Sequence, residues 1–179
     1  MFIFIGGLVG TGKTVLAKRV AENLNIFYYE IDKAKAEVIN ANPVLQYNMR
    51  YNKPYAEEPK LMIYSRAFEH LRELSKTHGH VIADEDFHKK HSRQIFFERV
   101  RESLGVCLVV WVKADEELII ERLTARQREG HLLKEPVGMY LAMKMALNAF
   151  DDADIQFENN EPLDMAAEKL TKLIKEKLK

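Results

Sequence analysis

The sequence predicts a three-layer α/β fold, in which helices cover both faces of a parallel sheet. Short apolar runs alternate along the 179-residue chain with longer segments whose apolar residues recur every three or four positions. Strands that are separated by helices pair in parallel through right-handed crossovers. With 47% hydrophobic residues, the chain (1–179) suits a single domain with a sizeable core and is too short for two full-sized domains.

The first strand and the first helix flank a glycine-rich turn. Residues 1–5 form an apolar run that predicts a buried strand. Residues 13–24 place apolar side chains on one helical face, which predicts a helix. The aromatic run at 27–31 predicts a second strand, and Asp32 lies at its C-terminal end.

A stretch with several prolines interrupts the next helical region. A helix is expected over about residues 33–40, and another from residue 58 to about 76, where apolar residues recur at three- and four-residue steps. The segment between them is expected to be irregular, because its prolines prevent one continuous helix. These prolines are Pro43, Pro54 and Pro59. The whole stretch of about 33–79 is the natural place for a substrate subregion.

Two strands and a helix follow. Residues 81–84 predict a short buried strand with Asp84 at its exit. Residues 89–104 have a helical apolar pattern, and Gly105 is expected to cap this helix at its C-terminal end. The run at 106–112 predicts the most apolar strand of all.

The last third of the chain completes the alternation. Acidic residues at 115–117 are typical of the first turn of a helix. A further helix is expected after Pro136, within residues 132–150. Residues 155–158 predict an edge strand, and 164–179 predict a closing amphipathic helix.

The glycine-rich turn carries a phosphate-binding motif. Residues 7–14 match the pattern G-x-x-x-x-G-K-[ST] without a mismatch, between a strand and a helix. In such a loop the backbone N–H groups face inward, Lys13 reaches the β- and γ-phosphates, and Thr14 offers its hydroxyl to Mg²⁺. The sequence therefore predicts a site for Mg·ATP or a similar triphosphate. The expected nucleotide-binding residues are Gly7, Leu8, Val9, Gly10, Thr11, Gly12, Lys13, Thr14 and Val15.

Two acids follow strands at the same edge of the predicted sheet. Ligands of such sheets bind beyond the C-terminal ends of the strands, where Asp32 and Asp84 are both expected. Asp32 is suited to take or align the proton of an acceptor hydroxyl, and Asp84 to hold Mg²⁺ together with Thr14. The alternative is that each acid only caps the N-terminus of a helix.

Arginines gather in the region of about 122–136. Arg122 and Arg126 are four residues apart, hence on one helical face, and Arg128 follows where the helix should end. On a closing lid, their guanidinium groups would stabilise the transferred phosphoryl group and exclude water. The alternative is a solvated helix face paired with Glu129.

Bulk composition points to no particular partner. Lys and Arg together number 27, as do Asp and Glu, so no strong net charge draws the chain to nucleic acid or to anionic lipid. No segment approaches membrane-spanning length. The lone Cys107 is expected to be a buried apolar residue, which fits a reducing compartment and a cytoplasmic location. A monomer or a homodimer is expected.

The histidines indicate no metal centre. His88 and His91 are close enough to share a metal on a helix, but no cysteine or third ligand is nearby. Both are therefore interpreted as exposed helix residues.

Taken together, four blocks of sequence resemble the small P-loop kinases. The blocks are the phosphate-binding loop, residues 31–35, residues 81–87 and residues 121–126. This group contains polynucleotide 5′-hydroxyl kinases, gluconate kinases, zeta-toxin-like enzymes and chloramphenicol phosphotransferase-like enzymes. The resemblance spans essentially the whole chain, although only the loop is highly specific.

The resemblance implies a sheet of five parallel strands in the order 2-3-1-4-5 with a helical lid. It also implies that Asp32 is the base toward an acceptor hydroxyl and that Arg126 belongs to the lid, with Lys35 and Arg128 near the acceptor. Lys35 is a departure, because family members often have arginine there. Lysine keeps the charge but loses the planar bidentate grip on a phosphate.

The sequence leaves four hypotheses for the function open. The favoured one is an ATP-dependent kinase that acts on a hydroxyl of a small metabolite, such as a sugar or a nucleoside. A nucleoside monophosphate kinase should carry several arginines in the substrate subregion, which has only Arg50, Arg66 and Arg72. A polynucleotide 5′-hydroxyl kinase is disfavoured, without being excluded, by the charge balance and by Lys35. A non-catalytic nucleotide-binding module would keep Lys13 but tolerate loss of Asp32.

Overall fold

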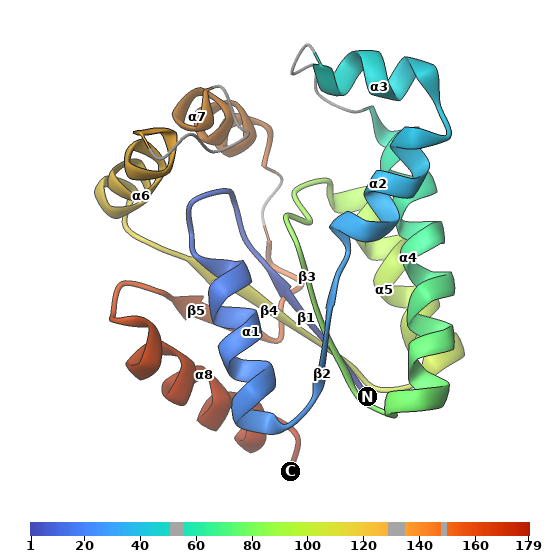
Figure 1. The fold of residues 1–179 in the computed structure, drawn as a ribbon. Helices are drawn as coiled ribbons and strands as arrows, with labels where there is room; N and C mark the ends of the chain where they lie inside the picture. The colour runs from blue at the N-terminus through green and yellow to red at the C-terminus, as the bar shows by residue number, and fades with distance from the viewer. Residues whose placement is uncertain (51–55, 129–134, 148–149) are drawn as a thin grey trace.

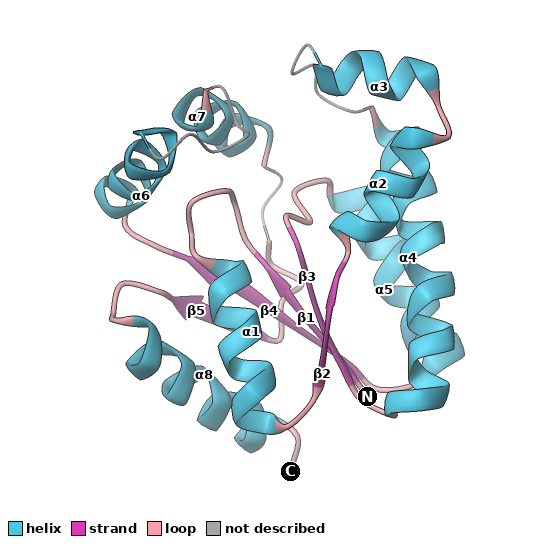
Figure 2. Cartoon of the chain, viewed as in Figure 1, coloured by secondary structure: helices cyan, strands magenta, loops and turns pink. Residues whose placement is uncertain are grey.

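The computed structural model describes residues 1–50, 56–128, 135–147 and 150–179. Five parallel strands form one sheet in the order β2-β3-β1-β4-β5, which confirms the expected fold class and strand order (Figure 2). The strands are β1 (Phe2–Gly6), β2 (Phe27–Glu30), β3 (Val81–Glu85), β4 (Cys107–Lys113) and β5 (Ile155–Glu158).

Helices cover both faces of this sheet (Figure 1). On one side, α1 (Lys13–Leu24) packs against α8 (Leu163–Lys177). On the other side, α4 (Glu57–His78) packs between α5 (Lys90–Leu104) and α2 (Asp32–Asn40). The remaining helices are α3 (Pro43–Arg50), which contacts α2, and the neighbouring pair α6 (Glu116–Arg128) and α7 (Pro136–Ala146).

The alternation of side chains along the strands explains the two cores. Successive residues of a strand point to opposite faces of the sheet. Phe2 and Phe4 of β1 therefore lie in the core under α4 and α5, whereas Ile3 and Ile5 lie in the core under α1 and α8. Because both faces are covered, the inner strands β1 and β4 are nearly continuous apolar runs, as is typical of parallel sheets.

The helix and strand bounds agree closely with the sequence-based expectations, except around the prolines. The segment expected to be irregular contains α3, which begins at Pro43, and Pro59 lies in the first turn of α4. Proline is tolerated there because the first N–H groups of a helix have no intrahelical partner. Pro54 lies outside the described residues.

Cys107 is only partly buried, at the start of β4, where burial raises the pKa of its thiol to about 12. The expectation of a small apolar residue is thus met in part. Within the described residues, no helix has the length and apolar character needed to cross a membrane.

Candidate active site

The phosphate-binding loop leaves β1 and adopts a conformation that requires glycine. Gly10 and Gly12 have φ angles of 86° and 81°, in the left-handed region that favours glycine. A Cβ atom on Gly10 would lie 2.7 Å from the Ile119 side chain of α6, and one on Gly12 would lie 2.7 Å from the Asn159 amide nitrogen. The loop is therefore packed tightly against α6 and against the residue that follows β5.

Hydrogen bonds hold the loop in this conformation. The Thr11 hydroxyl donates to the Leu8 carbonyl at 2.8 Å. The Thr11 carbonyl accepts from Asn159 Nδ2 at 2.8 Å and from Arg122 Nη1 at 3.3 Å. Arg122 also donates to the Asn159 carbonyl at 3.2 Å, and burial together with the neighbouring Arg126 lowers the pKa of its guanidinium. Arg122 thus contacts the nucleotide loop directly.

Asn159 is a site residue that the sequence analysis missed. It is buried directly after β5, at the carboxyl edge of the sheet. A polar residue directly after a predicted strand is the feature of the sequence that indicates such a position. The same feature indicates Asp32 and Asp84.

The first helix presents its N-terminus to the loop. Helix α1 begins at Lys13, where no side chain among the described residues caps the helix, and the positive end of its dipole faces the loop. Lys13 and Thr14, in the first turn, are both half-buried.

Asp84 meets Thr14 on the α1 side of the sheet. Its carboxylate accepts from the Thr14 hydroxyl at 2.6 Å and from the Tyr28 hydroxyl at 2.6 Å. Burial and Asp84 raise the pKa of Tyr28, so its hydroxyl remains a donor. Asp84 is not a helix N-cap, because it lies within β3 and α5 begins only at Lys90.

The oxygen atoms of Thr14 and Asp84 are suitable ligands for a magnesium ion. A hydroxyl and a carboxylate are oxygen ligands of the kind that Mg²⁺ takes, usually together with water and substrate phosphates. In the part of the chain that the structure describes, no group of three or more His, Cys, Asp or Glu side chains could hold a metal ion. Thr14 and Asp84 would hold such an ion together with the phosphates of a bound nucleotide.

Asp32 lies at the exit of β2 on the same edge of the sheet. It is the first residue of α2, and the N-cap position belongs to Ile31, so Asp32 is not the cap. Its side chain is exposed and accepts from Lys35 Nζ at 3.1 Å. Burial opposes the charge on Lys35, but Glu85 and Asp32 outweigh it and raise the pKa of this lysine.

A buried ion cluster on the α4 side was also missed. Lys60 of α4 is only 2% exposed, and its ammonium group donates to Glu85 at 2.6 Å and to Asp86 at 3.0 Å. Burial and the nearby Asp86 raise the pKa of Glu85. Burial opposes ionisation of Asp86 too, but Lys60 and His88 hold the pKa of Asp86 well below its usual range.

The interpretation of His88 as an exposed helix residue is wrong. His88 precedes α5, is half-buried, and its Nδ1 lies 2.6 Å from Asp86 Oδ1. The backbone N–H of His88 donates to the same carboxylate oxygen, and this local bond holds the residue outside the helix. His91 lies in α5 and is exposed, as expected.

The expected lid is described only in part. Arg126 lies in α6 and is half-buried. Arg128 ends α6, but its side chain lies outside the described residues, as do residues 129–134, including Glu129. The side chain of Arg50 at the end of α3 is likewise outside them.

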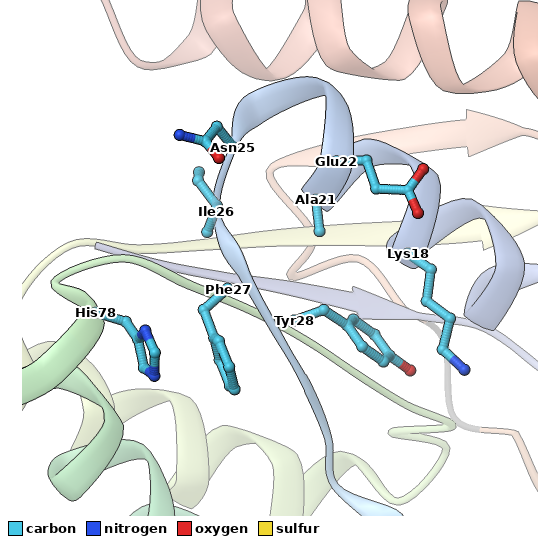
Figure 3. A pocket seen from close by; sticks show the side chains of 8 residues that line it. All are labelled: Lys18, Ala21, Glu22, Asn25, Ile26, Phe27, Tyr28 and His78. Carbon is cyan, nitrogen blue, oxygen red and sulfur yellow. The ribbon is translucent and has the colours of Figure 1, made fainter.

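A separate hollow of about 510 Å³ lies beside the amino end of the edge strand β2 (Figure 3). The rings of Phe27 and His78 stack there at 3.9 Å, and Lys18 lies 5.3 Å from the ring of Tyr28. No residue of the phosphate-binding loop lines it. The chemistry of the loop, rather than this volume, locates the candidate active site.

The loop, the strand order and the flanking helices define a P-loop domain. The sequence matches the family described as an AAA domain over residues 2–147, so the chain belongs to this family. No match was found among curated proteins.

Solved structures with this fold include several kinases. A sugar kinase from Janibacter sp. HTCC2649 matches with a TM-score of 0.76 and 19% identity, over 97% of this chain and 94% of that chain. A gluconokinase from Sinorhizobium meliloti 1021 has a TM-score of 0.68 and 16% identity, over 96% and 94%. A shikimate kinase from Acinetobacter baumannii, in complex with shikimate, has a TM-score of 0.56 and 19% identity, over 99% and 95%. The chain therefore has the fold of the small P-loop kinases.

Proposed function

We propose that this protein is an ATP-dependent phosphotransferase that moves the γ-phosphate of Mg·ATP to a hydroxyl of a small metabolite, such as a sugar or a nucleoside. The observation that carries the proposal is the pairing of Thr14 with Asp84 at 2.6 Å, beside a formed phosphate-binding loop. Asp32 stands at the exit of β2, on the same edge of the sheet. The shared edge of Thr14, Asp84 and Asp32 supports the proposal that nucleotide, metal and acceptor bind side by side.

The nucleotide is bound by residues 7–15. The N–H groups of the loop and the α1 dipole face the phosphates, and Lys13 neutralises the β- and γ-phosphates. Arg122, which contacts the Thr11 carbonyl, and Arg126 on the same helix stabilise the charge of the transferred group. Thr14 and Asp84 hold Mg²⁺, which neutralises charge on the phosphates when it is bound.

The acceptor is placed by groups at the exits of β2 and β3. Its hydroxyl oxygen attacks the γ-phosphorus while its proton passes to the Asp32 carboxylate, and the bond from the γ-phosphorus to the bridging oxygen breaks to release ADP. Lys35 holds Asp32 in place at 3.1 Å and lies beside the acceptor, with Arg128 contributing from the end of α6. The acceptor region comprises residues of about 33–79.

Two observations favour a small-metabolite acceptor over a nucleotide. Solved structures with this fold carry the names sugar kinase, gluconokinase and shikimate kinase. In addition, two arginines of the acceptor region are paired within the protein. Arg66 binds Glu37, and Arg72 binds Glu69 and Glu73. Nothing in the bulk charge favours nucleic acid, and a single domain with one cysteine suits a cytoplasmic monomer or homodimer.

The test measures the rate of ADP release and the Kd of Mg·ATP for two substituted proteins. Asp32→Asn should lower the rate of ADP release at least a hundredfold and leave the Kd of Mg·ATP within about threefold, because the base acts only on the acceptor. Lys13→Ala should weaken Mg·ATP binding itself. The matched control is Glu37→Gln, which removes a carboxylate from the same helix and should retain activity.

ADP release should be measured with a panel of acceptors that contains sugars, nucleosides, nucleotides and 5′-hydroxyl oligonucleotides. Preference for a nucleotide or an oligonucleotide would replace the proposed acceptor class. Tight binding of Mg·ATP without ADP release on any acceptor would instead indicate a non-catalytic binding module.

A further inference from the structure

Charged side chains converge where β2 and β3 end, beside the proposed acceptor. Glu85 pairs with Gly6 in the register of the sheet, so it lies next to the start of the phosphate-binding loop. Lys35 lies in the first turn of α2, directly after β2, and the end of β2 pairs with the end of β3 through Glu30 and Asp84. Consistent with this position, Glu85, Asp32 and Asp86 raise the pKa of Lys35. The acceptor cluster, as we call it, consists of Asp32, Lys35, Lys60, Glu85, Asp86 and His88.

Both ammonium groups of the acceptor cluster are already paired. Lys35 faces Asp32 at 3.1 Å. Lys60 is shared between Glu85 at 2.6 Å and Asp86 at 3.0 Å. The cluster therefore contains three carboxylates and two ammonium groups. Its net charge is not positive even when His88 is protonated.

An anionic acceptor fits this arrangement poorly. A carboxylate or a phosphate needs a guanidinium or ammonium group to pair with, and a buried charge without a partner is costly. Recruiting Lys60 for that purpose would leave the buried Glu85 carboxylate without its cation and would leave Asp86 with His88 alone. A hydroxyl donates to these carboxylates, and an amine adds a favourable charge.

We propose that the acceptor is an uncharged or amine-bearing polyhydroxyl compound rather than a carboxylate or a phosphate ester. This inference rests on the proposed function. It separates the protein from kinases of gluconate and shikimate, compounds that carry a carboxylate, although their fold is shared. The charge of the cluster, and not the fold, sets this preference.

The test uses acceptors that differ in charge but share a hydroxyl framework. With the wild-type protein and Mg·ATP, kcat/KM for ADP release is measured for glucose, glucosamine and gluconate. A second pair is adenosine and adenosine monophosphate. In the series that supports turnover, the neutral or amine-bearing member should exceed the anionic member by about tenfold or more, because a like charge near the cluster raises the barrier.

The outcomes separate the two proposals. A higher kcat/KM for gluconate or for the monophosphate would overturn the charge preference and leave the phosphotransferase standing. ADP release from none of these acceptors, with Mg·ATP still bound, would overturn the phosphotransferase and the preference with it.

A substitution within the cluster tests its role directly. Glu85→Gln removes one negative charge while keeping the shape of the side chain, and should raise the ratio of kcat/KM for the anionic over the neutral acceptor about threefold or more. A ratio measured on one preparation does not depend on the fraction that is folded. Glu102→Gln, which changes an exposed carboxylate of α5, is the matched control and should leave the ratio unchanged. An equal ratio in Glu85→Gln and wild type would contradict the assignment.

Discussion

At the scale of single residues, β3 shows how neighbouring acids serve two different purposes. Asp84 and Glu85 are consecutive and therefore point to opposite faces of the sheet. Asp84 meets Thr14 on the α1 side, whereas Glu85 meets Lys60 on the α4 side. The two acids thus point to opposite faces of β3, but both lie at the carboxyl edge of the sheet, beside the start of the phosphate-binding loop.

The hydroxyl of Tyr28 gives a specific prediction for the metal site. Tyr28→Phe removes one of the two donors that orient the Asp84 carboxylate. Because groups that orient a metal ligand typically contribute 10- to 100-fold to affinity, the Mg²⁺ concentration for half-maximal ADP release should rise about tenfold. The rate at saturating Mg²⁺ should stay near that of the wild type. A magnesium titration of ADP release measures both quantities.

Tyr29→Phe is the matched control. The Tyr29 hydroxyl lies 2.7 Å from the His70 ring, on the opposite face of the sheet from Tyr28. Its loss should cost about 1 kcal/mol of unfolding free energy, the usual value of one hydrogen bond, without changing the Mg²⁺ requirement. If both variants need the same Mg²⁺ as the wild type, Asp84 does not hold the metal.

At the scale of elements, the sequence predicts what depends on local pattern. The bounds of α1 and β5 agree with the expectation, because each follows from apolar periodicity within the element. The sequence does not predict helix α3, because Pro43 at its first position is also typical of irregular structure. How residues 40–60 divide into helices depends on whether each proline lies in the first turn of a helix. The apolar pattern alone does not determine this.

Contacts between distant elements were the part that could not be predicted. Asn159 and Thr11 are 148 residues apart, and Lys60 and Glu85 are 25 apart. The loop is predicted from its motif, and Asp32 and Asp84 are expected beside it because strand exits share one edge of the sheet. The partner of a lysine in a helix depends on how that helix packs against the rest of the fold. The sequence around Lys60 therefore does not predict its buried ion pairs.

The packing of α6 on the phosphate-binding loop predicts a cost for any side chain at Gly10. In Gly10→Ala, the new Cβ would lie 2.7 Å from Ile119 and 2.9 Å from Leu123. Displacing α6 also moves Arg122 away from the Thr11 carbonyl. The Kd of Mg·ATP, measured by calorimetry, should therefore rise about tenfold or more, a loss of about 1.4 kcal/mol.

Gly79→Ala controls for the backbone. Gly79 also has a positive φ of 70°, but a Cβ there would meet nothing within 4 Å. Both variants should lose about 1–2 kcal/mol of stability from the left-handed backbone, and only Gly10→Ala should lose nucleotide affinity. Equal affinities in the two variants would show that α6 does not support the loop.

At the scale of the whole molecule, one buried arginine joins three segments. Arg93 of α5 is fully buried and donates to the Phe87 carbonyl after β3 at 3.2 Å. It also donates to Asp152 at 3.0 Å, and its guanidinium lies 4.0 Å from the ring of Phe150. Phe87 has a φ of 49°, a strained conformation for a residue other than glycine, which this bond helps to hold. The exit of β3 and the approach to β5 are thus fixed to the same helix.

Arg93→Met should therefore destabilise the whole domain. Removing one partner of a buried ion pair leaves Asp152 without its charge partner and typically costs about 3–5 kcal/mol of unfolding free energy. The only tryptophan, Trp111, stacks on Phe150 at 4.1 Å, so its fluorescence reports both unfolding in urea and any displacement of Phe150. Arg99→Met, on the same helix, removes an exposed pair with Glu69 and a contact with Phe68, and should cost only about 1 kcal/mol. Equal urea midpoints for the two variants would mean that Arg93 holds no more of the fold together than a surface residue does.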